Sequence, residues 1–225
     1  MELIPRFMLP APIDVFKALV RESHLLYENS LTTLTEAFLG LVISIILGFI
    51  LSYIMDASNL IYKTVYPLLV ISQTVPVIAI APLLVLWFGY GIAPKIVLIV
   101  LVCFFPITIG LLNGYRTINP DTNKLLQSMG ASSWQTFRHL KLQASLPTFF
   151  AGLKIAVSYS IVGAVIAEWL GGSNGLGVYM TRVRKSYSFD KMFAVIILIS
   201  LISIVLIWLV SIVEKKTQPY RYIKE

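Results

Sequence analysis

The chain has 225 residues, of which 57% are hydrophobic and only 13% are charged, and its mean hydropathy is +0.83. Because an ordinary soluble domain is about a quarter charged, this composition excludes such a domain and indicates an integral membrane protein. The formal net charge of +7 does not indicate nucleic-acid binding, since the Lys and Arg residues lie in loops and at the ends of apolar segments, where anionic headgroups attract them.

Residues 1–30 predict a segment on the membrane surface. Their apolar side chains recur at helical spacing, with charged residues between them: Ile13, Phe16, Leu19 and Val20. This pattern is typical of an interfacial amphipathic helix. Three prolines interrupt residues 5–12, so no cleavable signal peptide is expected.

Five apolar segments follow, each close to the roughly 20 residues that cross a membrane as a helix. They are residues 31–55, 65–88, 96–113, 149–170 and 192–213. The second contains Pro76 and Pro82, which remove backbone donors and predict kinks in a helix that faces protein or a cavity. We therefore predict an all-α membrane protein with five transmembrane helices in a single domain, 1–225, and with its termini on opposite sides.

Residues 115–147 are the one long polar stretch of the chain. Asn119-Pro120-Asp121 is a helix-start signal, and the helix is expected to end at Gly130. A second short helix follows, and Ser145-Leu146-Pro147 is expected to end it. The two helices have apolar faces: Leu125, Leu126 and Met129 in the first, and Trp134, Phe137 and Leu140 in the second. Such a long connection favours binding to a partner in the aqueous phase, although an amphipathic hairpin at the interface would show the same pattern.

This stretch resembles the signature of the membrane-spanning permease subunits of bacterial binding-protein-dependent ABC importers. The signature is Glu-Ala-Ala, three residues, Gly, nine residues, Ile-x-Leu-Pro, and it aligns here with residues 124–126, Gly130 and residues 140–143. Gly130 and the apolar spacing match, whereas Lys124-Leu125-Leu126 and Gln143 depart from it. Residues 130–140 and the delayed Leu146-Pro147 look like the nitrate, sulfonate, taurine and pyrimidine-precursor branch. The resemblance extends through four further segments: 9–19, 72–91, 94–107 and 167–177.

The resemblance implies the type I ABC importer permease (MetI-like) fold in a bacterial inner cell membrane. It places residues 115–147 and the C-terminal tail in the cytoplasm, and residues 171–191 and the N-terminal amphipathic helix outside. Members of this branch usually carry a further spanning helix ahead of the part matched by residues 9–19, so either the true start lies upstream or this permease works with five helices.

In this family, the cytoplasmic loop docks a short coupling helix into a cleft of an ATPase subunit. The resemblance assigns this contact to Leu126, Met129, Gly130, Ala131, Ser132 and Trp134. The implied partners are a second permease copy in a homodimer, two ABC ATPase subunits that bind ATP and Mg, an external substrate-binding lipoprotein or periplasmic protein, and the lipid bilayer. No cofactor is expected in this chain.

Polar side chains at membrane depth usually line a cavity. The candidates for the translocation pathway are Gln73, Thr74, Pro76, Ser158, Tyr159, Ser160 and Glu168. Hydrogen bonds between packed helices would explain the same residues equally well. For Glu168 we favour a structural or gating role, in which it pairs with Lys95 or with the basic residues 182–185.

The sequence gives little reason to expect an enzyme. His24 and His139 are solitary, Cys103 is the only cysteine, and no carboxylate pair has catalytic spacing on a helix. GGSNGLG at 171–177 lacks the Gly-Lys-Ser/Thr of a phosphate-binding loop and is expected to be an external turn that contacts the binding protein. The alternative class is a stand-alone channel or secondary carrier, which would need its own selectivity residues in the membrane.

The substrate is the least determined property, because the binding protein sets selectivity in this design. The sequence of residues 72–91 and 94–107 looks slightly more like the pyrimidine-precursor or vitamin-related members, which favours a thiamine-type pyrimidine precursor or a related vitamin as the substrate. An aliphatic sulfonate, taurine or nitrate is the alternative.

Overall fold

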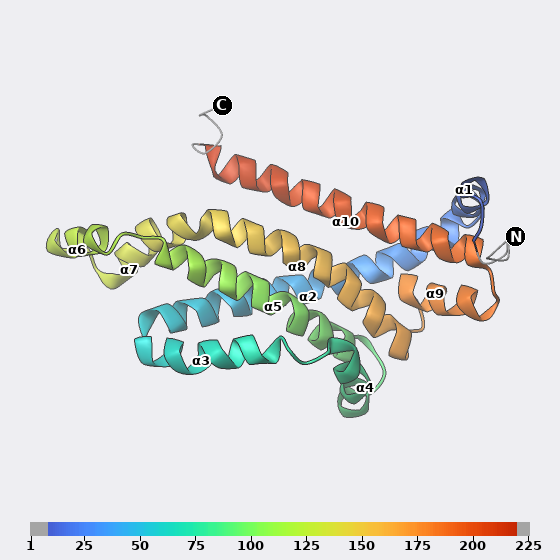
Figure 1. Cartoon of the computed structure of the whole chain (residues 1–225), viewed down its shortest axis with the longest axis horizontal. Coiled ribbons are helices and arrows are strands. Elements are labelled where there is room, and N and C mark those ends of the chain that lie inside the picture. The colour runs from blue at the N-terminus through green and yellow to red at the C-terminus, as the bar shows by residue number, and fades with distance from the viewer. Residues whose placement is uncertain (1–8, 220–225) are drawn as a thin grey trace, which may run out of the picture.

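Long, mostly apolar segments form the four longest helices, which lie along the long axis of the molecule (Figure 1). They are α2 (Ser23–Ala57), α5 (Ile92–Arg116), α8 (Leu142–Gly171) and α10 (Phe189–Thr217). Each belongs to a helix long and apolar enough to cross a membrane. The computed structural model describes residues 9–219, and these residues contain helices and no strand.

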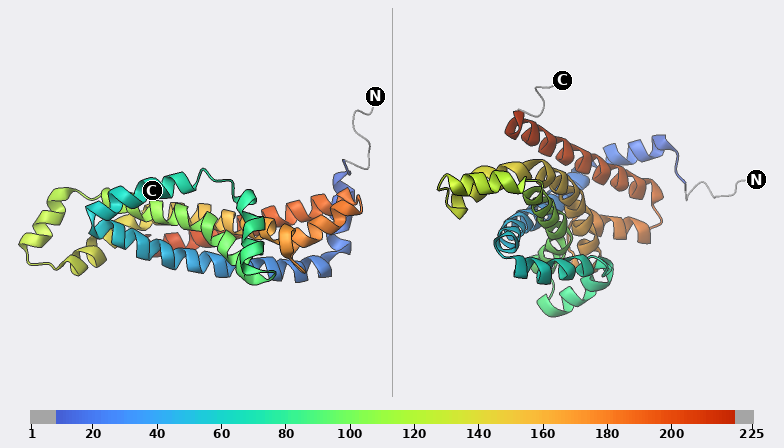
Figure 2. Two further views of the ribbon diagram at one scale, coloured as in Figure 1. Left: turned by 90° about the horizontal axis from the view of Figure 1, so that it is seen from below. Right: turned by 60° about the vertical axis from the view of Figure 1, so that its left-hand side comes forward.

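Short helices mark the two ends of this bundle. One end carries α1 (Pro12–Arg21) and α9 (Leu176–Lys185), and we call it the α9 end. The other carries α6 (Pro120–Ser128) and α7 (Ser133–Thr136), and we call it the hairpin end. In both views of Figure 2, α6 and α7 project beyond the long helices. α1 and the last turn of α10 lie at opposite ends, as the prediction of five spans requires (Figure 1).

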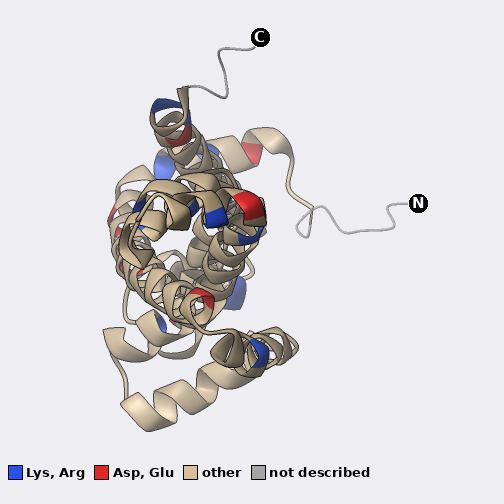
Figure 3. Ribbon diagram, turned by 90° about the vertical axis from the view of Figure 1, so that its left-hand side faces the viewer, with Lys and Arg blue, Asp and Glu red and all other residues tan. Residues whose placement is uncertain are grey.

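The second predicted span, 65–88, is a broken helix pair and not one kinked helix. α3 (Asn59–Ser72) and α4 (Val77–Phe88) meet at an angle of 97°, and together they form the fifth candidate span. Pro76 causes the break, because its extended backbone (φ −68°, ψ 115°) caps α4 and it cannot donate a hydrogen bond to α3. Pro82 remains inside α4. α4, the lowest helix in Figure 3, carries no charged residue.

Two further predicted boundaries are wrong. The surface segment 1–30 is not one unit, because α1 ends at Arg21 and residues from Ser23 onward belong to α2. The helix after the hairpin does not stop at Pro147, which lies inside α8. A π-helical turn, η1 (Phe137–Lys141), joins α7 directly to α8, and the 30-residue α8 tolerates the one backbone donor that Pro147 removes.

α1 is amphipathic as predicted. Val15 and Ala18 are buried against Ala194 of α10, while Ile13 and Phe16 stay exposed on its other face. Residues 1–8, where the absence of a signal peptide is expected, and residues 220–225 of the polar tail lie outside the described part of the chain.

Glycines bring the central helices into close contact. Gly40 and Gly48 of α2 lie against Ile99 and Ile107 of α5, and a Cβ at Gly48 would come within 2.8 Å of Ile107. Both glycines therefore permit close packing of α2 against α5. α5 and α8 approach even more closely, since a Cβ at Gly110 would lie 2.6 Å from the Thr148 carbonyl oxygen. The three helices therefore form the centre of the bundle.

Candidate functional site

The polar stretch forms a hairpin of two short helices, residues 119–136, at the end of the bundle. The Asn119 side chain accepts a hydrogen bond from the Asp121 amide at 2.9 Å and so caps α6. Gly130 has φ +83°, a conformation that favours glycine, and it ends the helix as predicted. Ser132 and Gln135 then start α7 with a reciprocal capping box, whose hydrogen bonds measure 2.8 and 3.2 Å.

The tip of this hairpin carries exposed apolar side chains. Met129 is 73% exposed and Trp134 57%, so both apolar side chains are accessible at the surface. Gly130 and Ser132 are also exposed, whereas Leu126 and Ala131 are half-buried. Leu125, which the candidate contact set omits, is 60% exposed. Helical periodicity places Leu125, Leu126 and Met129 on one face. It does not show that Leu125 and Met129 are exposed while Leu126 is half-buried.

Aromatic rings connect the base of the hairpin to the bundle. The Phe137 ring lies edge-on to Tyr53 of α2 at 4.6 Å between centroids, and to Tyr115 of α5 at 5.6 Å. Trp134 stacks on Phe137 at 5.9 Å. The Tyr115 hydroxyl lies 3.3 Å from that of Ser52. These contacts fix the second helix of the hairpin to the ends of α2 and α5.

One ion pair reinforces this attachment. Lys141 donates to Asp56 at 2.7 Å, across 85 positions of sequence, with both side chains about one-fifth exposed (22% and 19%). Beside the pair, a cleft of about 360 Å³ separates the end of α2 from the hairpin, with Asn123 and Thr136 among its lining residues. The hairpin therefore touches the bundle along one side only.

The α9 end is organised in the opposite way, around a buried polar cluster that we define as Asn29, Thr33, Glu36, Lys95 and Glu168. Asn29, Thr33 and Glu36 lie on one face of α2 at helical spacing. All five residues are at least 90% buried. Their polar groups need partners inside the protein, since water does not reach them.

This cluster binds the backbone at the start of α9. The amides of Gly175 and Leu176 donate to the Asn29 and Thr33 side chains at 2.8 and 2.9 Å. The Gly177 amide donates to Glu168 at 2.6 Å, so the carboxylate lies on the N-terminus of α9, where the helix dipole favours negative charge. Gly175 has φ +124° and packs directly on the Glu168 carboxylate, which leaves no space for a Cβ.

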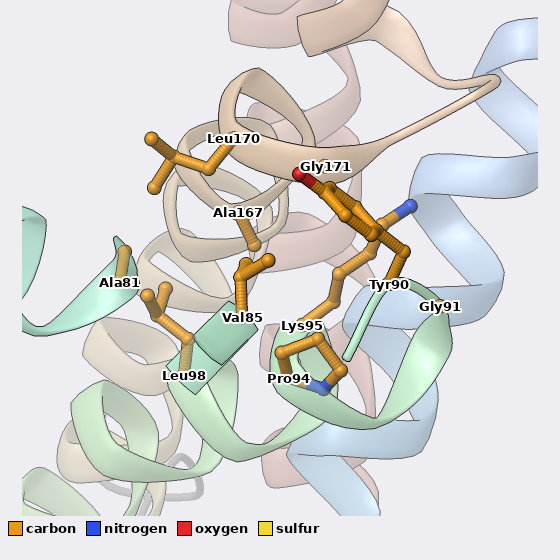
Figure 4. Close-up of a pocket in the computed structure, with 10 residues that line it drawn as sticks. All are labelled: Ala81, Val85, Tyr90, Gly91, Pro94, Lys95, Leu98, Ala167, Leu170 and Gly171. Atoms are coloured by element: carbon orange, nitrogen blue, oxygen red, sulfur yellow. The ribbon is translucent and has the colours of Figure 1, made fainter. Parts of the chain in front are cut away.

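Lys95 supplies the positive charge of the cluster. Figure 4 shows its side chain extending from α5 toward α2, beside the Tyr90 ring that lies near Gly171. Its ammonium group pairs with Glu36 at 2.5 Å, and the two side chains are only 9% and 6% exposed. The sequence-based pairing of Lys95 with Glu168 is thus wrong, because Glu36 of α2 takes Lys95 and Glu168 accepts from Thr33 at 2.7 Å.

The predicted pathway residues do not form one group in the single chain. Gln73, Thr74 and Pro76 are exposed at the break between α3 and α4, on the outside of the bundle. Ser158 is half-buried and donates to the Lys154 carbonyl at 3.3 Å. Glu168 lies in the buried cluster and is only 1% exposed.

Comparisons with known proteins agree with this architecture. Residues 40–219 match the model of the family described as binding-protein-dependent transport system inner membrane component. The formylaminopyrimidine transport permease protein ThiX of Halalkalibacterium halodurans is 39% identical over 216 residues, which cover 96% of this chain and 86% of the relative. The putative aliphatic sulfonates transport permease protein SsuC of Bacillus subtilis is 30% identical over 224 residues, with coverages of 95% and 78%.

A solved structure shares the fold at low sequence identity. The crystal structure of an amino acid ABC transporter with histidines superposes with a TM-score of 0.70 and 15% identity, covering 89% of this chain and 98% of that chain. The all-helical bundle, the glycine-broken hairpin at the predicted position and these matches lead to one identification. The chain belongs to the binding-protein-dependent transport system inner membrane components, the multi-pass permease subunits of ABC importers that work with ATPase and binding-protein components.

Proposed function

We propose that two copies of this chain form the translocation pathway of an importer in the bacterial cell membrane, and that each hairpin docks one of two separate ATPase subunits in the cytoplasm. The observation that carries this proposal is the projecting hairpin with Leu125, Met129 and Trp134 exposed at its tip. An isolated apolar tip is costly in water and gains most by entering a partner groove. The α9 end then faces outward, toward the substrate-binding protein.

Variants of the tip test the docking directly. Proline at position 130 cannot adopt φ +83°, and Trp134→Asp puts a charge into the apolar contact, so Gly130→Pro and Trp134→Asp are expected to abolish co-purification of the ATPase subunits. Thr122→Ala, an exposed change on α6, is the matched control and leaves co-purification unchanged. If both tip variants still co-purify with a stimulated ATPase, the hairpin is not the docking element.

The surface around the broken span favours a second copy as its partner. Leu68, Ile71 and Ile78 are each more than half exposed on α3 and α4, next to the polar residues Gln73 and Thr74. Apposing two such surfaces would bury the apolar side chains and turn the polar break toward a shared central path. Crosslinking between copies through Ile71→Cys, in a Cys103→Ala background, is the expected result. A crosslink-free but active importer would contradict this placement.

We propose a thiamine-type pyrimidine precursor as the substrate, with an aliphatic sulfonate, taurine or nitrate as the alternative. The higher identity to the formylaminopyrimidine permease than to the sulfonate permease supports the first choice. The test is ATP-dependent uptake of labelled formylaminopyrimidine into vesicles that contain the permease, its ATPases and its binding protein. Uptake that an aliphatic sulfonate blocks would reverse the choice, and uptake without the ATPases would indicate a stand-alone carrier.

A further inference from the structure

The hairpin is attached to the rest of the chain at few points, and the strongest attachments are to the last turns of α2. The Asp56 and Lys141 side chains pair at 2.7 Å, and the Tyr53 and Phe137 rings meet at 4.6 Å. Both contacts join α2 to η1, the π-helical turn that links the hairpin to α8. A tilt of the hairpin therefore pulls on α2 as well as on α8.

The remainder of the hairpin has little packing against the bundle. No residue of α6 is buried, and a cleft of about 360 Å³ lies between the hairpin and the end of α2. A segment with few buried contacts and space beside it moves more readily than a packed core helix. Its motion passes into the bundle only through the contacts at its base.

α2 is well suited to pass that motion on. It has 35 residues, about 50 Å of continuous helix, and contains no proline. Its other half carries Asn29, Thr33 and Glu36, which bind the turn before α9, Glu168 and Lys95. One rigid helix thus connects the hairpin base to the buried polar cluster at the opposite end.

We infer that Asp56 and Lys141, supported by Tyr53 and Phe137, form a joint through which the hairpin moves α2 and, through α2, the turn at 172–177. This inference rests on the proposed function, because it assumes that ATPase closure moves the hairpin. These four residues are positioning residues, since they lie behind the docking tip and act through α2. Movement of the hairpin reaches α2 only while both Asp56 and Lys141 are present.

The first test measures uptake per ATP hydrolysed by the assembled importer in vesicles. Asp56→Asn and Lys141→Met are expected to keep the ATPases bound and hydrolysing while uptake per ATP falls at least fivefold. The exchanged pair, Asp56→Lys with Lys141→Asp, restores the ratio to within about twofold of the parent. Glu22→Gln is the matched control, because Glu22 forms a comparable, mostly buried pair with Lys191 at the α9 end, and it leaves the ratio unchanged.

The outcomes separate this inference from the proposed function. An unchanged ratio in both single variants, or an exchanged pair that fails to recover, overturns the joint. Loss of ATPase binding in Asp56→Asn also overturns it, because the pair would then belong to the docking surface. If Gly130→Pro and Trp134→Asp both still bind the ATPases, it is the proposed function that fails.

A second readout follows the far end of α2. Asn174 is exposed in the turn, so Asn174→Cys in a Cys103→Ala background gives a single accessible thiol at position 174. Trapping the ATPases in their closed state is expected to change its rate of modification at least threefold, and Asp56→Asn is expected to abolish the change. A response that survives Asp56→Asn would show that another helix carries the motion, and the inference would be wrong.

Discussion

The two ends of this bundle differ in which side chains they bury and which they expose. At the α9 end, five buried polar side chains from α2, α5 and α8 bind one another and the backbone of the next helix. At the hairpin end, exposed apolar side chains sit on short capped helices that touch the bundle on one side only. Polar side chains at the α9 end thus bind within the chain, while the hairpin end leaves apolar side chains exposed.

The largest effect is expected from unpairing the buried charges. Lys95→Met leaves Glu36 as a buried carboxylate without its counter-ion, which destabilises by about 3–5 kcal/mol. The double variant Lys95→Met with Glu36→Gln is expected to recover most of this loss. Thermal unfolding in detergent measures both. Equal losses in the single and double variants would mean that the pair does not stabilise the α9 end.

Substitutions at two glycines with positive φ allow the two ends to be compared directly. Gly175→Ala at φ +124° pushes a methyl group into the Glu168 carboxylate, so a loss of about 3 kcal/mol or more is expected from strain and a broken cluster. Gly130→Ala at φ +83° meets no atom within 4 Å, and only the backbone cost of about 1 kcal/mol applies. Thermal unfolding in detergent measures the loss of stability in both variants. A larger loss at position 130 would reverse the comparison.

Breaking the aromatic base of the hairpin is expected to cost less. Tyr53→Leu removes the edge-on contacts to Phe137 and Trp134 but keeps apolar volume, so stability falls by about 1 kcal/mol. Limited proteolysis of residues 119–136 is expected to accelerate, because the hairpin then opens more often. Val42→Leu, a half-buried change in the middle of α2, serves as the control with an unchanged cleavage rate.

The smallest effect is expected at an exposed ion pair on the hairpin. Lys124 and Asp121 lie 3.8 Å apart with both side chains mostly in water, so Lys124→Ala changes stability by less than about 0.5 kcal/mol. ATPase stimulation tests whether this residue, which replaces the glutamate of the family signature, takes part in docking. A strong loss of stimulation with unchanged stability would extend the docking surface to Lys124.

Local signals in the sequence predicted the hairpin well. Asn119-Pro120 and Gly130 act through their own backbone chemistry, so α6 begins and ends where the sequence predicts. By contrast, the stop expected at Pro147 failed, because a long helix held on both sides absorbs one missing hydrogen bond.

Tertiary pairings could not be predicted in the same way. Glu36 and Lys95 are 59 positions apart, and only the packing of α2 on α5 brings them together. Lys141 and Asp56 meet across 85 positions, through a π-helical turn that has no signal in the sequence. The 97° bend between α3 and α4 likewise exceeds the kink that a proline alone predicts.

The ATPase subunits are expected to dock on the hairpin and not on the α9 end. Hydrogen–deuterium exchange of the permease, with and without its ATPases and in the absence of the binding protein, compares the two ends in one experiment. We predict that the ATPases slow exchange in residues 120–136 at least tenfold and leave residues 172–185 unchanged. Unchanged exchange in residues 120–136 with the ATPases bound would show that the ATPases dock elsewhere on the chain.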